Sequence, residues 1–150
     1  MAVGPFLSHD TGFASLLSTD DWTNDAYYAV LATHSETPAR DTQVDYEDIL
    51  EEVASGGDYS PVALASKTCS VDGSNNVVFD CAKITFTAAG DITARYLYIL
   101  KGTAATPNNA DEIIGHIDLD GAGNISSVGA EFSFDPHANG LFYVPRTTAA

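Results

Sequence analysis

The stretch 92-ITARYLYILK-101 is the longest apolar run of the chain, and Arg95 interrupts it. Its second half is apolar on both faces of an expected strand, which is typical of a central strand covered on both sides. Strict alternation assigns Thr93, Arg95, Leu97, Ile99 and Lys101 to one face and Ile92, Ala94, Tyr96, Tyr98 and Leu100 to the other. We therefore expect a sheet protein built around this strand.

A guanidinium inside a core strand needs a partner, because a buried charge that loses its partner typically costs about 3–5 kcal/mol. The candidate partners are acids at the ends of neighbouring predicted strands, namely Asp80, Asp91 and Asp118. The planar fork of arginine can hold a carboxylate with two hydrogen bonds. We expect Arg95 to form a structural ion pair that fixes the register between strands. The alternative is that Arg95 reaches the surface and contacts a neighbouring chain in an assembly.

Further β-type runs lie on both sides of this strand, and turn residues such as Gly, Asn, Asp and Pro separate them. They are 26-AYYAVLAT-33, 62-VALASKTCSV-71, 76-NVVFD-80, 83-KITFT-87, 112-EIIGHID-118, 130-AEFSFD-135 and 140-GLFYVP-145. Their spacing favours a mainly β fold, an antiparallel β-sandwich or jelly-roll-like single domain over residues 23–145. A partly open barrel fits the same strands.

The remaining segments complete the expected organisation. Apolar residues recur near the helical period in 43-QVDYEDILEEVAS-55, and Gly56-Gly57 follows, so this segment predicts the one short helix. Residues 1–22 are expected to form an irregular N-terminal arm, in which 13-FASLL-17 has room for one or two helical turns. Residues 146–150 form a C-terminal tail of small residues.

The charge is strongly unbalanced, with 21 acidic and 6 basic residues among 150 and a net charge of −15. Nucleic acid is excluded as a direct ligand and an anionic membrane is disfavoured, because both need clustered Lys and Arg. No apolar run approaches the roughly 20 residues that span a bilayer, and the N-terminus does not resemble a signal peptide. We expect synthesis in the cytoplasm and an acidic surface that is either merely solvated or meets a basic partner or a divalent cation.

The common motifs of enzyme active sites do not occur in the sequence. The four histidines, His9, His34, His116 and His137, lie far apart in different predicted elements. We therefore predict a protein that is not an enzyme and that needs no cofactor. Cys69 and Cys81 flank a turn-like segment and could face each other across a hairpin, but free thiols are the favoured interpretation without a secretory signal.

One segment, 116-HIDLDGAGN-124, partly resembles a calcium-binding loop through Asp118, Asp120 and Asn124. Ala122 occupies a position where such loops carry a ligand, and Gly129 stands where they carry a bidentate glutamate. A plain turn between strands is therefore favoured, and no metal site is predicted.

Several segments follow one another in a characteristic order from Tyr27 to the C-terminal strand. They are 27-YYAVLA-32, 37-TPARDT-42, 46-YEDILEEVASGGDY-59, 75-NNVVFD-80, 92-ITARY-96 with Ile99 and Lys101, 113-IIGHIDL-119, and 132-FSFD-135 followed by Gly140. In these segments the sequence resembles a family of small structural proteins of tailed bacteriophages. The order and spacing of these pieces carry the resemblance, and the cysteines are not part of it.

The resemblance implies a structural role in the virion, most simply as a capsid decoration (cement) protein. Such a protein binds the outer surface of the major capsid protein shell in many copies, and we expect it to form a homo-oligomer such as a trimer. The residues expected to dock are Pro5, Phe6, Leu7, Phe13, Leu16, Leu17, Phe142 and Tyr143. The alternative is a tail-fibre, spike or other host-recognition component, in which Tyr27, Tyr28 and Tyr59 could contact surface sugars, although core packing is the favoured interpretation of Tyr27 and Tyr28.

Overall fold

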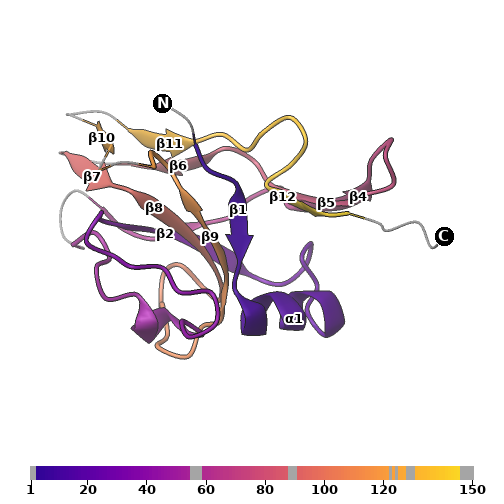
Figure 1. Ribbon diagram of the computed structural model, residues 1–150, viewed down its shortest axis with the longest axis horizontal. Helices are drawn as coiled ribbons and strands as arrows, with labels where there is room; N and C mark the ends of the chain where they lie inside the picture. Colours follow the sequence, from indigo (N-terminus) through magenta and orange to yellow (C-terminus); the bar gives the residue numbers. More distant parts are fainter. Residues whose placement is uncertain are drawn as a thin grey trace.

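A computed structural model describes residues 3–54, 59–87, 91–121, 123, 125–127 and 131–145 (Figure 1). The predicted antiparallel, mainly β domain is confirmed. Its elements are β1 (Phe6–Ser8), α1 (Asp10–Ser18), β2 (Tyr27–Ala32), the 3-10 turn η1 (Tyr46–Asp48), β3 (Val62–Ala63), β4 (Thr68–Val71), β5 (Val77–Asp80), β6 (Ile84–Phe86), β7 (Ile92–Ala94), β8 (Tyr96–Lys101), β9 (Ile113–Asp118), β10 (Ile125–Ser127), β11 (Phe132–Phe134) and β12 (Phe142–Val144).

The strand predicted as central holds that place, because β8 lies between β9 and β2 in a five-stranded sheet of order β1-β9-β8-β2-β3. Alternate residues of β8 enter two separate cores. Leu97 and Ile99 face a large core that small sheets complete on the other side, namely β10-β7, β11-β6 and β12-β5-β4. Tyr98 and Leu100 face a smaller core that Ile49 and the partly buried Tyr46 cover. Both faces of the sheet are therefore covered where β8 crosses it.

The prediction of one unbroken strand from 92 to 101 is wrong at Arg95, which separates β7 from β8. Its backbone still bonds on both sides, since its N–H donates to Ala32 and its carbonyl accepts from Leu119. Because of the interruption at Arg95, the residues of β7 face the opposite side from the one that strict alternation predicts. Ile92 and Ala94 join the large core with Leu97 and Ile99, and not the side that carries Tyr96, Tyr98 and Leu100.

The helix predicted over residues 43–55 does not form. Among the residues of this segment that the structure describes, only the three of η1 are helical, and residue 55 lies outside the described ranges. Asp45 and Asp48 form a capping box that starts η1, but the backbone after this turn bonds elsewhere. The N–H of Glu51 donates to Glu36 Oε2 at 2.8 Å, and the N–H of Val53 donates to the carbonyl of Leu31 at 2.8 Å. These N–H groups are therefore not available for the i to i−4 bonds of a helix.

The N-terminal residues are part of the domain, so the prediction of an irregular arm over 1–22 is wrong for the residues described. β1 pairs antiparallel with β9, with Leu7 opposite His116, and α1 packs against the same strand (Figure 1). Gly12 allows this approach, because a Cβ there would lie 2.7 Å from the carbonyl carbon of Ile113. The predicted tail at 146–150 lies outside the described residues.

The β4–β5 hairpin projects from the body at the end of the β12-β5-β4 sheet (Figure 1). All four residues of β4 are exposed, which leaves this edge strand without a covering layer. In the described part of the chain, no helix is long and apolar enough to cross a membrane.

Candidate functional site

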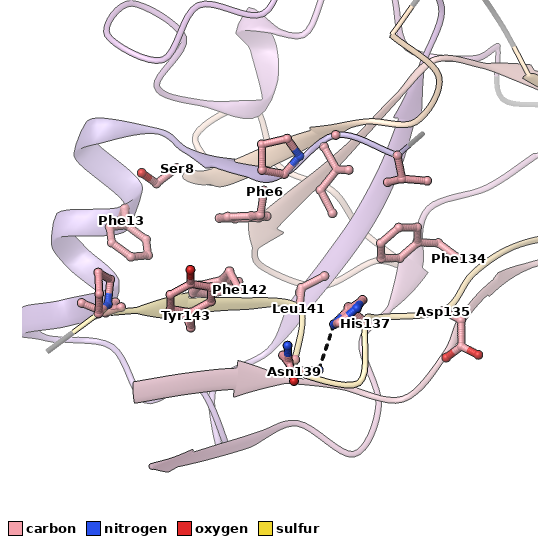
Figure 2. Close-up of a pocket in the computed structure, with 17 residues that line it drawn as sticks. Phe6, Ser8, Phe13, Phe134, Asp135, His137, Asn139, Leu141, Phe142 and Tyr143 are labelled. Atoms are coloured by element: carbon pink, nitrogen blue, oxygen red, sulfur yellow. Dashed lines mark hydrogen bonds between the residues drawn. The ribbon is translucent and has the colours of Figure 1, made fainter. Parts of the chain in front are cut away.

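A groove of about 780 Å³ lies where the first and last elements of the domain meet (Figure 2). Residues 3–6, Ser8 and Phe13 line one wall, and residues 134, 135, 137 and 139–145 line the other. The strands that bound it, β1 and β12, are edge strands, and among the residues that the structure describes each pairs with one other strand. The groove therefore offers two strand edges together with an apolar lining.

The N-terminal wall depends on a close approach between β1 and β9. The ring of Phe6 lies over Gly115, and a Cβ at Gly115 would lie 2.6 Å from the Leu7 carbonyl oxygen and from Phe6 Cε1. Any larger residue at 115 would displace β1 or the Phe6 ring. The absence of a side chain at 115 thus gives the wall its position.

The C-terminal wall begins with the tight turn His137–Gly140, in which the N–H of Gly140 donates to the carbonyl of His137 at 2.7 Å. Gly140 has a φ of +96°, a conformation that favours glycine. The turn directs β12 alongside β5, with Phe142 opposite Phe79. Phe142 then points toward Phe6 across the groove, and the two rings stack with centroids 4.4 Å apart (Figure 2).

The chemistry of the groove suits binding. Its lining is dominated by aromatic and aliphatic side chains, and Asp135 and His137 are its acidic and imidazole groups. His137 Nδ1 accepts a hydrogen bond from the backbone N–H of Asn139 at 3.1 Å (Figure 2). An apolar groove with few polar groups binds ligands through burial of surface and uses the polar groups for orientation.

The structure divides the residues predicted to dock. Five line the groove, namely Pro5, Phe6, Phe13, Phe142 and Tyr143. Phe142 is 6% exposed and Tyr143 is 56% exposed, so Phe142 belongs to the core and Tyr143 is available for contact. Leu7 does not line the groove, Leu16 is buried, and Leu17 is exposed on α1 beside a separate shallow hollow.

Sequence reasoning missed Phe134 and His137, which also line the groove. Phe134 alternates with Ser133, which indicates a buried face but not which cavity it borders. His137 lies in a turn, and no local pattern connects it with the N-terminal wall.

The four histidines lie far apart in the sequence, and the structure brings two of them together. His9 and His116 are buried, and His9 Nε2 lies 2.9 Å from His116 Nδ1. His9 lies between the end of β1 and the start of α1, and His116 lies on β9. The pairing of β1 with β9 therefore brings the two rings together. Neither the spacing nor the neighbours of these residues in the sequence indicate the contact.

The predicted ion pair of Arg95 forms with Asp118. Nε and Nη2 of Arg95 donate to the two carboxylate oxygens at 3.2 and 2.9 Å. The guanidinium hydrogen bonds, together with the N–H groups of Gly121 and Asp120, lower the pKa of the Asp118 carboxyl to about 2. The side chains are 21% and 25% exposed, so the pair lies at the border of the core. Of the other candidates, Asp80 Oδ1 accepts from Cys81 N–H and Asp91 is an exposed residue.

The same pair accounts for the loop that partly resembles a calcium site. Both oxygens of Asp118 are engaged, and Oδ1 also accepts from the N–H of Asp120 and of Gly121 at 3.2 and 2.8 Å. These bonds bend the chain at Asp118–Gly121. Asn124 lies outside the described residues. No group of three or more His, Cys, Asp or Glu is placed to hold a metal ion in the ranges that the structure describes.

Replacing Arg95 with leucine is expected to lower the free energy of unfolding by roughly 1–2 kcal/mol, less than for a fully buried pair because solvent screens this one. A double-mutant cycle of Arg95→Leu and Asp118→Asn, measured by urea unfolding, should give a coupling of about 1 kcal/mol. Additive effects of the two substitutions would show that the pair contributes no coupling.

The two cysteines do not bond to each other. Cys69 is exposed on β4 opposite Phe79, whereas Cys81 is buried beyond the end of β5, and both are free thiols. Burial raises the pKa of the Cys81 thiol to about 12, so this residue stays protonated and unreactive at neutral pH.

Comparison of the chain with known protein families, with curated proteins and with solved structures gives no match in any of the three.

Proposed function

We propose that this chain is a structural protein of a tailed-bacteriophage particle, most simply a decoration protein that binds the outer surface of the capsid shell in many copies. The observation that carries the proposal is the apolar groove between β1 and β12. The resemblance of the sequence to small phage structural proteins supports the same assignment.

The groove suits an extended segment of the shell protein. An extended peptide can add a strand to an exposed sheet edge, with backbone hydrogen bonds giving affinity and pockets receiving alternate side chains. Both walls of the groove carry such an edge, and Tyr143 offers an exposed ring on one of them. The net charge of −15 favours a segment that combines apolar residues with lysine or arginine.

The host-recognition alternative has less support. The tyrosines suggested for contact with sugars, Tyr27, Tyr28 and Tyr59, are 1%, 0% and 4% exposed and belong to the two cores. A sugar-binding surface would need aromatic rings that solvent can reach. A tail-fibre role would therefore have to use other residues.

Quantitative mass spectrometry of purified particles, separated into heads and tails, tests the proposal. Hundreds of copies that fractionate with heads are the expected result. A handful of copies in the tail fraction would replace decoration by the fibre or spike alternative. The absence of the chain from particles would overturn a virion role altogether.

Introducing a charge at Tyr143 is expected to reduce incorporation into particles at least tenfold without unfolding the protein. In Tyr143→Glu a carboxylate would replace an exposed aromatic ring of the apolar groove, and docking would have to remove that charge from water. The matched control is Val71→Glu, which alters an equally exposed apolar residue on β4 at a distance from the groove lining. Equal incorporation of the two variants would exclude the groove as the docking site.

A further inference from the structure

A buried pair of histidines ties the N-terminal segment to the central sheet. His9 and His116 are 0% and 4% exposed, and they are separated by 107 positions in the sequence. His9 Nδ1 lies 2.9 Å from the backbone oxygen of Gln43, and His9 Nε2 lies 2.9 Å from His116 Nδ1. The chain of contacts therefore joins three segments: the entrance to α1, strand β9 and the loop before η1.

The contacts fix the protonation of both rings. The carbonyl oxygen of Gln43 can only accept, so His9 Nδ1 must carry a proton. A neutral His9 then has a free lone pair on Nε2, and the Nδ1–H of His116 donates to it. In this arrangement both rings are neutral, and each of the two N–H groups that donate in these hydrogen bonds has one acceptor. An added proton therefore places a positive charge in the interior.

Charged groups near the pair act on that added charge in both directions. His9 is the N-cap residue of α1, where the helix dipole is positive, and the guanidinium of Arg40 lies close enough to disfavour a proton on either ring. Asp10 of α1 favours a proton on His9, and Asp118 of β9 favours one on His116, but neither forms an ion pair with these rings within the described residues.

Strand β8 contacts His116 through the rings of Tyr96 and Tyr98, which carry no charge at neutral pH. On the other side of β9, the residue of β1 that lies opposite His116 is the uncharged Leu7. Burial lowers the pKa of His9. Burial, together with His9 and Arg40, lowers the pKa of His116 to about 4.

We propose that the His9–His116 pair is an acid-sensitive latch, whose protonation detaches β1 and α1 from β9 while β2 and β8 stay paired. The detachment is local because β1 is a three-residue edge strand, so its departure opens only the outer edge of β9. It also removes the Phe6 wall of the groove. The latch does not depend on the proposed function, because it follows from contacts within the chain alone.

The direction of the pH effect follows from proton binding. A solvated histidine has a pKa of about 6.5, so the detached segment binds protons more readily than the attached one. Attachment is complete above about pH 6.5 and weakens as the pH falls toward 4. Each histidine raises the ratio of detached to attached segment by up to about tenfold per pH unit within that window.

Hydrogen-exchange mass spectrometry between pH 7 and pH 4.5, corrected for the intrinsic exchange rate, tests the latch. Peptides that cover residues 6–18 should lose protection at least tenfold more than peptides that cover residues 96–101. Unchanged protection of residues 6–18, or an equal loss in both regions, would overturn the proposal.

Two variants separate the latch from general acid sensitivity. His116→Gln keeps an amide that can hydrogen-bond but does not titrate, so the loss of protection at residues 6–18 should become clearly less steep. His137→Gln, on the exposed turn of the groove, should leave the wild-type steepness unchanged. If His116→Gln does not fold, an NMR titration of the wild-type histidines decides. Protonation of His9 or His116 that coincides with exchange at residues 6–18 supports the latch, and protonation without it refutes the latch.

Discussion

Replacing Phe142 with alanine is expected to lower the free energy of unfolding by about 3–5 kcal/mol, as for other large aromatic residues in cores. Its ring stacks on Phe6 and Phe79 with centroids 4.4 and 4.8 Å apart, and Trp22 and Phe13 contact it edge-on. The substitution leaves a cavity between the N-terminal segment and β5 that neighbouring rings cannot fill. Urea unfolding followed by far-ultraviolet circular dichroism gives the measurement.

The adjacent residue is a matched control. Tyr143 is 56% exposed, so Tyr143→Ala should change stability by no more than about 0.5 kcal/mol. The comparison separates the core residue of β12 from its surface residue. Similar losses in the two variants, or a loss below about 1 kcal/mol for Phe142→Ala, would contradict the ring cluster described here.

Gly12→Ala is expected to destabilise the protein by about 2–3 kcal/mol, as overpacked substitutions do. In an exposed helix the same change stabilises by roughly 0.5–1 kcal/mol, so the expected sign is reversed. The reason is contact between α1 and β9: the added Cβ would overlap the carbonyl group of Ile113. Thermal unfolding should show a midpoint about 4–12 °C below that of the wild type.

Gly73→Ala provides the control for Gly12→Ala. Gly73 lies in the turn between β4 and β5, and no atom lies within 4 Å of an added Cβ. The free energy of unfolding of Gly73→Ala should stay within about 0.5 kcal/mol of the wild-type value. If Gly12→Ala matches or exceeds the wild type in stability, α1 does not rest on β9 at this distance.

The sequence predicted what depends on local pattern and on strong pairwise chemistry. Strands such as β2 and β9 have long apolar runs with clear ends, and both form close to the predicted residues. The partner of Arg95 could also be predicted in part, because a guanidinium near a core requires a carboxylate and three acids ended neighbouring strands. The register of the sheet decides which of the three acids is the partner. It places Tyr96, the residue after Arg95, opposite Asp118.

Tertiary contacts decided the features that were predicted wrongly. Residues 43–55 have a helical pattern, but Glu36 binds the N–H of Glu51, and the N–H of Val53 bonds to the carbonyl of Leu31. The helix forms instead at residues 10–18, where Leu16 and Phe13 pack into a core formed largely by later strands. The weaker helical pattern, at residues 10–18, forms a helix, and the stronger one, at residues 43–55, does not, because tertiary packing outweighs helix propensity.

The groove itself could be predicted only as a set of apolar residues near both ends of the chain. Phe6 and Tyr143 are more than 130 positions apart, and no periodicity links them. Their meeting requires β1 to pair with β9 and β12 to pair with β5. The sorting of Phe142 into the core and Tyr143 onto the surface follows from the pleat of β12, which alternates the two residues between faces.

The pairing of β1 with β9 also sets an order of events during biosynthesis. Leu7 leaves the ribosome 109 positions before its partner His116, which at typical translation rates is a delay of roughly 5–20 s. Throughout that time Phe6, Phe13 and Leu16 have no completed core to enter. The residues of β1 are therefore synthesised well before the strand with which they pair, and the nascent chain exposes this apolar segment in the meantime.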